Sequence, residues 1–127
     1  MTDLEAIKQY RAAGLFWEFL YSRPLPWIFE RDPAIAAKIR ERDRQRMAKA
    51  ERVMRQAEKA LNQLPRHEWK AAMINRYLLR RDHLATAEVM NYSETSVRRF
   101  EQAAIDHLKA RERLKAQKAA ESPANRF

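Results

Sequence analysis

The chain contains no cysteine and only one glycine, Gly14. Without cysteine it forms neither disulfides nor thiolate metal sites, which fits a protein of a reducing cytosol. With one glycine it cannot build the glycine-rich phosphate loop of nucleotide-binding enzymes. Long hydrophobic runs are also missing: no apolar run approaches the roughly 18 residues that a membrane span needs. The N-terminus lacks the charged and then hydrophobic layout of a secretory signal.

What dominates instead is a set of good helix formers: Ala, Arg, Lys, Glu, Gln, Leu and Met, with few β-branched residues. We therefore expect an all-α fold. A chain of 127 residues is long enough for one domain with its own core, or for a small domain with a helical arm. We expect an intracellular protein with no membrane contact.

Positive charge is in excess and unevenly placed. The chain has 26 Lys and Arg against 17 Asp and Glu, for a net charge of +9. Residues 1–30 carry three basic and four acidic side chains, residues 31–60 carry ten and five, and residues 61–127 carry thirteen and eight. Such an excess favours a polyanionic partner, and the partner surface should lie beyond Glu30.

The N-terminal part predicts two helices. The first runs from Asp3 to Tyr21 and ends at Arg23-Pro24-Leu25-Pro26, because two close prolines remove backbone donors. Trp27, Ile28 and Phe29 follow, and so many large apolar side chains at one break suggest burial against another helix or another subunit. Asp32 and Pro33 then give an N-cap and a first-turn proline.

The second helix should run from Asp32 to about Gln63. Its apolar positions follow spacings of three and four from Met47 onward, whereas Arg42, Asp43 and Arg46 interrupt the stripe upstream. Two interpretations stay open and are compatible. One is a long amphipathic helix with a solvated charged face, including an ion pair between Glu51 and Arg55. The other is a helical hairpin or coiled-coil contact that dimerises the protein.

Three further helices are predicted after Leu64-Pro65-Arg66. The first spans about His67 to Arg80, and a polar connector through His83 leads to a short helix from about Leu84 to Met90. The last helix starts after Ser93 and continues to about Ala120, and the tail over 121–127 should be loose. The inward positions of the first of these helices are Trp69, Met73, Ile74 and Tyr77.

The last helix has two chemically different sides. Ser93 can cap it, and Val97, Phe100, Ala104 and Leu108 share one side. The other side carries Thr95, Ser96, Arg98, Arg99 and Gln102. This division is what the recognition helix of a DNA-binding helix-turn-helix needs, because an apolar stripe holds it against shorter helices while a polar, basic face enters the major groove. We predict such a unit over Ala60 to Leu108.

No catalytic or metal site emerges from the sequence. His67, His83 and His107 are too far apart for a zinc pattern, so a structural or surface role is expected for each. The carboxylates occur singly among basic residues, and no nucleophile with a neighbouring base can be argued from local sequence. We therefore expect no enzyme activity and no cofactor.

Several short motifs resemble the fourth, promoter-recognising region of bacterial sigma factors. They are Ala60-Leu61-Asn62-Gln63-Leu64-Pro65, Met73-Ile74-Asn75-Arg76-Tyr77-Leu78, Met90-Asn91-Tyr92-Ser93 and Val97-Arg98-Arg99-Phe100 with Ala104. Within that group the chain is most similar to phage late transcription regulators of the ArpU/RinA type. The resemblance covers about residues 60–110. Together with the helix pattern, it leads us to expect a helical interaction or dimerisation region over 1–59, a helix-turn-helix DNA-binding domain over 60–120 and a flexible tail over 121–127.

One position departs from the pattern of the resembled family. A bulky aliphatic residue usually precedes the small residue of the first helix of the pair, whereas here Thr86 precedes Ala87. We expect Leu84 or Val89 to fill the space.

The resemblance also implies a set of DNA-binding residues. These are Ser93, Glu94, Thr95, Ser96, Arg98, Arg99 and Gln102. Arg and Gln make bidentate contacts with guanine and adenine edges, and hydroxyls or a helix N-terminus suit phosphates. Arg80 and Arg81, with Arg66 and Lys70, are candidates for contacts with the DNA backbone. The alternative for each residue is a solvated helix charge, or for Ser93 a helix cap only.

The expected function is therefore non-enzymatic, sequence-specific binding of double-stranded DNA by a phage late-gene activator in the cytoplasm of a bacterial host. The N-terminal helices would form a homodimer or contact RNA polymerase. One alternative is a DNA-packaging protein of the small-terminase type, which predicts a ring of many subunits. Another is a helical RNA-polymerase-binding adaptor that does not touch DNA, which salt-dependent duplex binding would exclude.

Overall fold

A computed structural model of the chain describes residues 1–23 and 31–121. The described part is helical and contains no strand, which confirms the all-α prediction. Its elements, in chain order, are α1 (Asp3–Ser22), α2 (Pro33–Asn62), α3 (His67–Met73), the π-helical turn η2 (Ile74–Leu78), α4 (His83–Met90) and α5 (Glu94–Ala120). The predicted proline break, the cluster of Trp27, Ile28 and Phe29, and residues 122–127 of the predicted tail lie outside the described residues.

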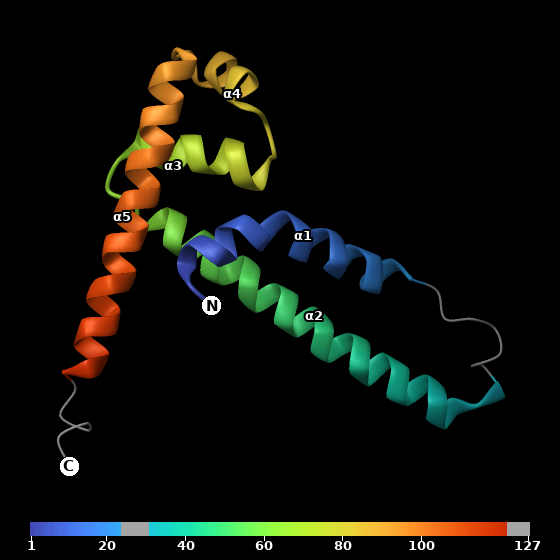
Figure 1. Ribbon diagram of the computed structural model, residues 1–127. Helices are drawn as coiled ribbons and strands as arrows, with labels where there is room; N and C mark the ends of the chain where they lie inside the picture. The colour runs from blue at the N-terminus through green and yellow to red at the C-terminus, as the bar shows by residue number, and fades with distance from the viewer. Residues whose placement is uncertain (24–30, 122–127) are drawn as a thin grey trace.

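Helices α1 and α2 lie side by side as an antiparallel hairpin that extends away from α5 (Figure 1). Helix α1 begins with a capping box, in which the Glu5 amide donates to Thr2 Oγ1 at 3.2 Å and the Thr2 amide donates to Glu5 Oε2 at 3.3 Å. Helix α2 begins as predicted, with Asp32 as the N-cap and Pro33 in the first turn. The hairpin gives α2 an apolar partner within its own chain.

Polar contacts between α1 and α2 explain the interrupted stripe of α2. Asp43 is buried, and it forms an ion pair with Arg23, which directly follows α1. Further along the hairpin, Trp17 Nε1 donates to Glu51 Oε1 at 2.9 Å. Glu51 also forms the predicted pair with Arg55, at 3.2 Å. The charged residue in the stripe is therefore an interhelical contact rather than a break in the packing.

The segment predicted as one helix from His67 to Arg80 changes character along its length. Its last turn is π-helical, and the Leu79 amide donates to the Ile74 carbonyl at 3.0 Å. Arg80 follows with φ of +56°, a left-handed conformation that side-chain-bearing residues adopt at a cost. The chain then enters α4, where Asp82 caps the helix by accepting from the Ala85 amide at 2.7 Å.

One hydrophobic core joins α1, α2, α3 and α5. It contains Ala6 and Ile7 of α1, Ala57, Ala60 and Leu61 of α2, Leu64, Met73 of α3, and Ala104 and Leu108 of α5. The domain boundary predicted between residues 59 and 60 lies within α2, and the core takes side chains from both sides of it. The N-terminal helices therefore help to position α3 and α5.

Replacing Ile7 by Ala tests this shared core. Ile7 is fully buried, so Ile7→Ala should lower the free energy of unfolding by about 2 to 4 kcal/mol. Because the core is shared, the helices of residues 64–120 should lose stability in the same transition, measured by urea unfolding with circular dichroism. The matched control is Leu114→Ala on the exposed part of α5, with an expected change below about 0.5 kcal/mol. An unchanged unfolding midpoint for Ile7→Ala would contradict the shared core.

Candidate nucleic-acid interface

A three-residue turn, Asn91 to Ser93, sets the direction of α5 relative to α4. Asn91 ends α4 in the left-handed conformation with φ of +60°, a role that asparagine tolerates better than most residues. The Tyr92 amide donates to the Ala87 carbonyl at 3.1 Å. Ser93 is the N-cap of α5, as predicted, and its hydroxyl accepts from the Ser96 amide at 3.1 Å.

The inner side of α5 holds the helix against the rest of the fold. Val97, Ala104 and Leu108 are buried. Phe100 is half-buried, and the Tyr92 ring packs edge-to-face on it with ring centroids 5.0 Å apart. The apolar stripe predicted for this helix therefore lies where expected. Glu101 stands among these residues and is buried too, with 8% of its surface exposed.

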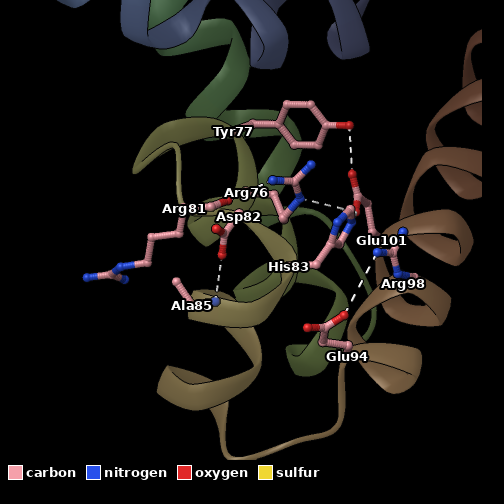
Figure 2. Close-up of polar contacts among 9 residues, drawn as sticks. All are labelled: Arg76, Tyr77, Arg81, Asp82, His83, Ala85, Glu94, Arg98 and Glu101. Carbon is pink, nitrogen blue, oxygen red and sulfur yellow. Dashed lines mark hydrogen bonds and ion pairs between the residues drawn. The ribbon is translucent and has the colours of Figure 1, made fainter.

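The buried Glu101 carboxylate binds side chains from two other elements (Figure 2). Its Oε2 lies 2.6 Å from His83 Nε2 at the start of α4 and 3.4 Å from Arg76 Nε on η2. Its Oε1 accepts from the Tyr77 hydroxyl at 2.9 Å. Because an ionised carboxylate only accepts, His83 Nε2 is the donor in this contact. These four residues, Glu101, Arg76, Tyr77 and His83, form the Glu101 cluster, which joins η2, α4 and α5.

The protonation of Glu101 reflects this arrangement. Burial alone would raise the pKa of its carboxyl group, but hydrogen bonds from His83 and Tyr77 and the nearby charges of Arg76 and His83 lower that pKa below its ordinary value. The pKa of Tyr77 moves the other way, to about 12, because burial and the Glu101 carboxylate both disfavour a phenolate there. At neutral pH Glu101 is therefore ionised and Tyr77 is a donor.

The outer side of the first turns of α5 is open to solvent. Thr95, Arg98, Arg99 and Gln102 are exposed, as are Ser93 and Glu94, while Ser96 is half-buried. The structure therefore gathers these seven predicted residues at one end of α5, on the end that projects beyond α3 in Figure 1.

Few contacts hold the polar side chains of this surface. Arg98 forms a long pair with Glu94, 3.9 Å between Nη2 and Oε2, and both side chains are largely exposed. Gln102 Nε2 donates to Asp106 Oδ1 at 2.9 Å. Arg99 forms no hydrogen bond or ion pair with any residue that the structure describes. Both guanidinium groups are thus available for a ligand at little cost.

Arg80 and Arg81 are placed differently from the α5 residues. Arg80 is exposed on the connector. The Arg81 guanidinium hydrogen-bonds the side chain of Asn75, and the Arg81 carbonyl accepts from Arg76 Nη1 at 2.7 Å. In Figure 2 the Arg81 side chain points away from Glu101, on the opposite side of the cluster from Arg98. The structure does not bring Arg81 to the Arg98 side of α5.

The other candidate DNA-backbone contacts, Arg66 and Lys70, lie at and near the start of α3, and the two remaining histidines lie on α3 and α5. Arg66 is exposed at the start of α3, and Lys70 is half-buried on that helix. His67 is exposed, whereas His107 packs against the Trp69 ring at 5.9 Å between centroids.

Thr86 itself occupies the inner side of α4. It is completely buried together with Ala87, whereas Leu84 and Val89 are more than half exposed. The expectation that Leu84 or Val89 fills this space is therefore wrong, because the two small residues are the ones that face the neighbouring helices. The Thr86 hydroxyl has no hydrogen-bond partner among the described residues.

Sequence reasoning missed the Glu101 cluster. A signal was present: Glu101 lies four residues after Val97 and three before Ala104, which places a carboxylate within the apolar stripe of α5. A charge at such a position requires buried donors. What the sequence does not identify is which donors reach it, since Arg76, Tyr77 and His83 are 18 to 25 residues away.

Glu101→Gln tests the role of the carboxylate. The folded-state pKa of Glu101 is depressed, so its contribution to stability is fully present above about pH 4.5 and is lost as the pH falls through the lower folded-state value. At pH 7 the variant should lose about 1 to 3 kcal/mol of unfolding free energy. Below pH 5 its stability should fall less steeply than that of the wild type.

The measurement is the urea midpoint followed by circular dichroism from about pH 7 to about pH 3. Glu41→Gln, which removes an exposed carboxylate on α2, is the control and should retain the wild-type profile. A Glu101→Gln profile that coincides with the wild type at every pH would contradict the role assigned to the cluster.

Among residues 1–23 and 31–121, no three His, Asp or Glu side chains gather in a way that could hold a metal ion. In the same ranges, every helix is too short or too polar to cross a bilayer. No protein-family model, no curated protein and no solved structure matches this chain.

Proposed function

We propose that the protein is a sequence-specific DNA-binding transcription regulator that reads duplex DNA with the first turns of α5. In this proposal α4 and α5 form a helix-turn-helix like that of sigma-factor region four, with α5 as the recognition helix. One observation carries it: Thr95, Arg98, Arg99 and Gln102 are all exposed on one side of α5, while the opposite side is buried and held through Glu101.

The chemistry of the exposed residues suits the major groove. Arg98 and Arg99 present planar donors that match the O6 and N7 acceptors of guanine, and the Gln102 amide matches adenine. Gln102 would exchange its contact with Asp106 for the base. The N-terminus of α5, with Ser93 and Thr95, offers hydroxyls and a positive helix end to a phosphate. Asp106 limits the reading surface to the first turns of α5, because its carboxylate repels the phosphates of the DNA backbone.

The role in phage late-gene activation is proposed from the resemblance of the motifs between Ala60 and Ala104 to the ArpU/RinA-type regulators. It is compatible with the net charge of +9, which favours association with a polyanion. Non-enzymatic action is part of the proposal, since Thr95, Arg98, Arg99 and Gln102 supply hydroxyl, guanidinium and amide groups suited to recognition.

Replacing Arg98 and Arg99 by Ala tests the reading surface. The double variant should bind its duplex at least about tenfold more weakly, because each good bidentate base contact contributes about 1 to 3 kcal/mol of discrimination. Binding is measured by fluorescence anisotropy with a duplex selected from a random library. The matched control is Arg40→Ala with Arg44→Ala, which removes two exposed charges from α2. Equal affinity of the two double variants would place the reading surface elsewhere.

We also propose that α1 forms a homodimer contact. Ala12, Leu15, Phe16 and Phe19 follow spacings of three and four on the outward side of α1, and the last three are exposed to 55%, 41% and 56%. Such a stripe fits a facing helix. Arg11 and Glu18 flank it one heptad apart, so two antiparallel copies of α1 would pair these charges twice across a two-fold axis.

Light scattering on the purified protein tests this contact. The wild type should have twice the chain mass, and Leu15→Glu should have the mass of one chain, because a carboxylate would be buried at the contact. Leu114→Glu, on the exposed part of α5, serves as the control and should remain dimeric. A ring of many subunits would favour the small-terminase alternative, and a wild-type monomer would remove the dimer from the proposal.

A further inference from the structure

A stripe of basic side chains runs along α2, away from the reading surface of α5. Its members are Lys38, Arg42, Lys49 and Arg52, with Gln45 between them. Their spacings of four, three, four and three residues keep them on one side of the helix. All five side chains are exposed. From Lys38 to Arg52 the stripe is about 21 Å long, at about 1.5 Å per residue.

The cations of this α2 stripe are not neutralised by the protein. Within the described residues, none of the four forms an ion pair. The acidic residues of α2 are engaged elsewhere: Glu41 with Arg44 and Gln45, Asp43 with Arg23, Glu51 with Arg55 and Trp17, and Glu58 with Tyr10. Four positive side chains of α2 are therefore left without an acidic partner among the described residues.

We propose that the α2 stripe binds the phosphate backbone of duplex nucleic acid, as a second contact surface in addition to α5. Regularly spaced, unpaired cations on a straight rod fit the regular charges of a duplex backbone, where they release condensed counterions. The stripe positions and supplies affinity without reading sequence. This inference rests on the proposed function in that it assigns the same class of ligand.

Two other polyanions fit the stripe less well. A membrane-surface helix inserts an apolar face between lipids, whereas the apolar side of α2 is buried against α1 and the core through Ala36, Ala50, Ala57 and Leu61. Proteins that bind single strands stack bases on aromatic side chains, and α2 contains no aromatic residue. A duplex needs neither of these features.

The test compares two triple variants of the full chain that each remove three positive charges from α2. The first, K38Q/R42Q/K49Q, removes most of the stripe. The second, R40Q/R44Q/R55Q, removes three exposed cations that lie elsewhere on the same helix. Binding to a duplex of about 20 base pairs is measured by fluorescence anisotropy over a range of salt concentrations, and circular dichroism checks that both variants keep the wild-type helix content.

The stripe variant should bind at least about tenfold more weakly at about 100 mM salt, and the slope of log affinity against log salt should lessen by about 2 to 3. The control variant should stay within about threefold of the wild type. Equal losses in the two variants would overturn the inference. So would a loss confined to binding of phosphatidylserine vesicles, with the duplex affinity of the two variants equal.

The outcome is distinguishable from that of the α5 proposal. If Arg98→Ala with Arg99→Ala lowers the duplex affinity but the two triple variants have equal affinities, the result supports α5 as the recognition helix and contradicts the proposal for the α2 stripe. If the stripe variant alone weakens binding, the stripe is the duplex contact and α5 is not the reading helix.

Discussion

The position of α5 depends on the buried carboxylate of Glu101. A buried charge is costly unless donors surround it, and this one has three, from η2 and from the first residue of α4. The arrangement specifies geometry more than it adds stability, because only one placement of η2, α4 and α5 brings Arg76, Tyr77 and His83 to the same two oxygens. Apolar packing of Val97 and Leu108 alone would tolerate a rotation or a sliding of α5.

Fixing one side of α5 defines what the other side presents. With Glu101 directed inward, Arg98, Arg99 and Gln102 stay exposed, on a surface free of strong internal contacts. The hairpin of α1 and α2 adds rigidity, because Ile7 and Leu61 share the core with Ala104 and Leu108. At the edge of that core, Lys115 Nζ of α5 lies 3.3 Å from Asp3 Oδ2 of α1. The protein thus offers preformed surfaces, which reduces the entropy lost on binding a partner.

Local sequence signals predicted where the helices start, but they did not predict the buried contacts of Asp43 and Glu101. Asp32 with Pro33, and Ser93 after Asn91, mark helix starts by chemistry that acts within a few residues, so the sequence sufficed for them. The π-helical turn of η2 and the left-handed Arg80 have no such local mark. Asp43 and Glu101 interrupt apolar stripes in the sequence, but the sequence does not identify their partners Arg23, Tyr77 and His83, which come from other parts of the chain. The exposed side of α5 could be predicted from the helical periodicity of its residues. The position of Arg81 away from that side could be learned only from the structure.

A titration of the nitrogen-15-labelled protein with a short duplex, followed residue by residue through its amide resonances, tests whether α5 reads DNA. The largest shifts should fall on Ser93 to Gln102, and the α2 stripe should be the next region affected. The amides of Arg76, Tyr77 and His83 should keep the shifts of the free protein, since the surfaces are preformed. Shifts confined to α1 and the C-terminal end of α5, or general broadening that shows α5 leaving α3 and α4, would contradict the proposed recognition helix.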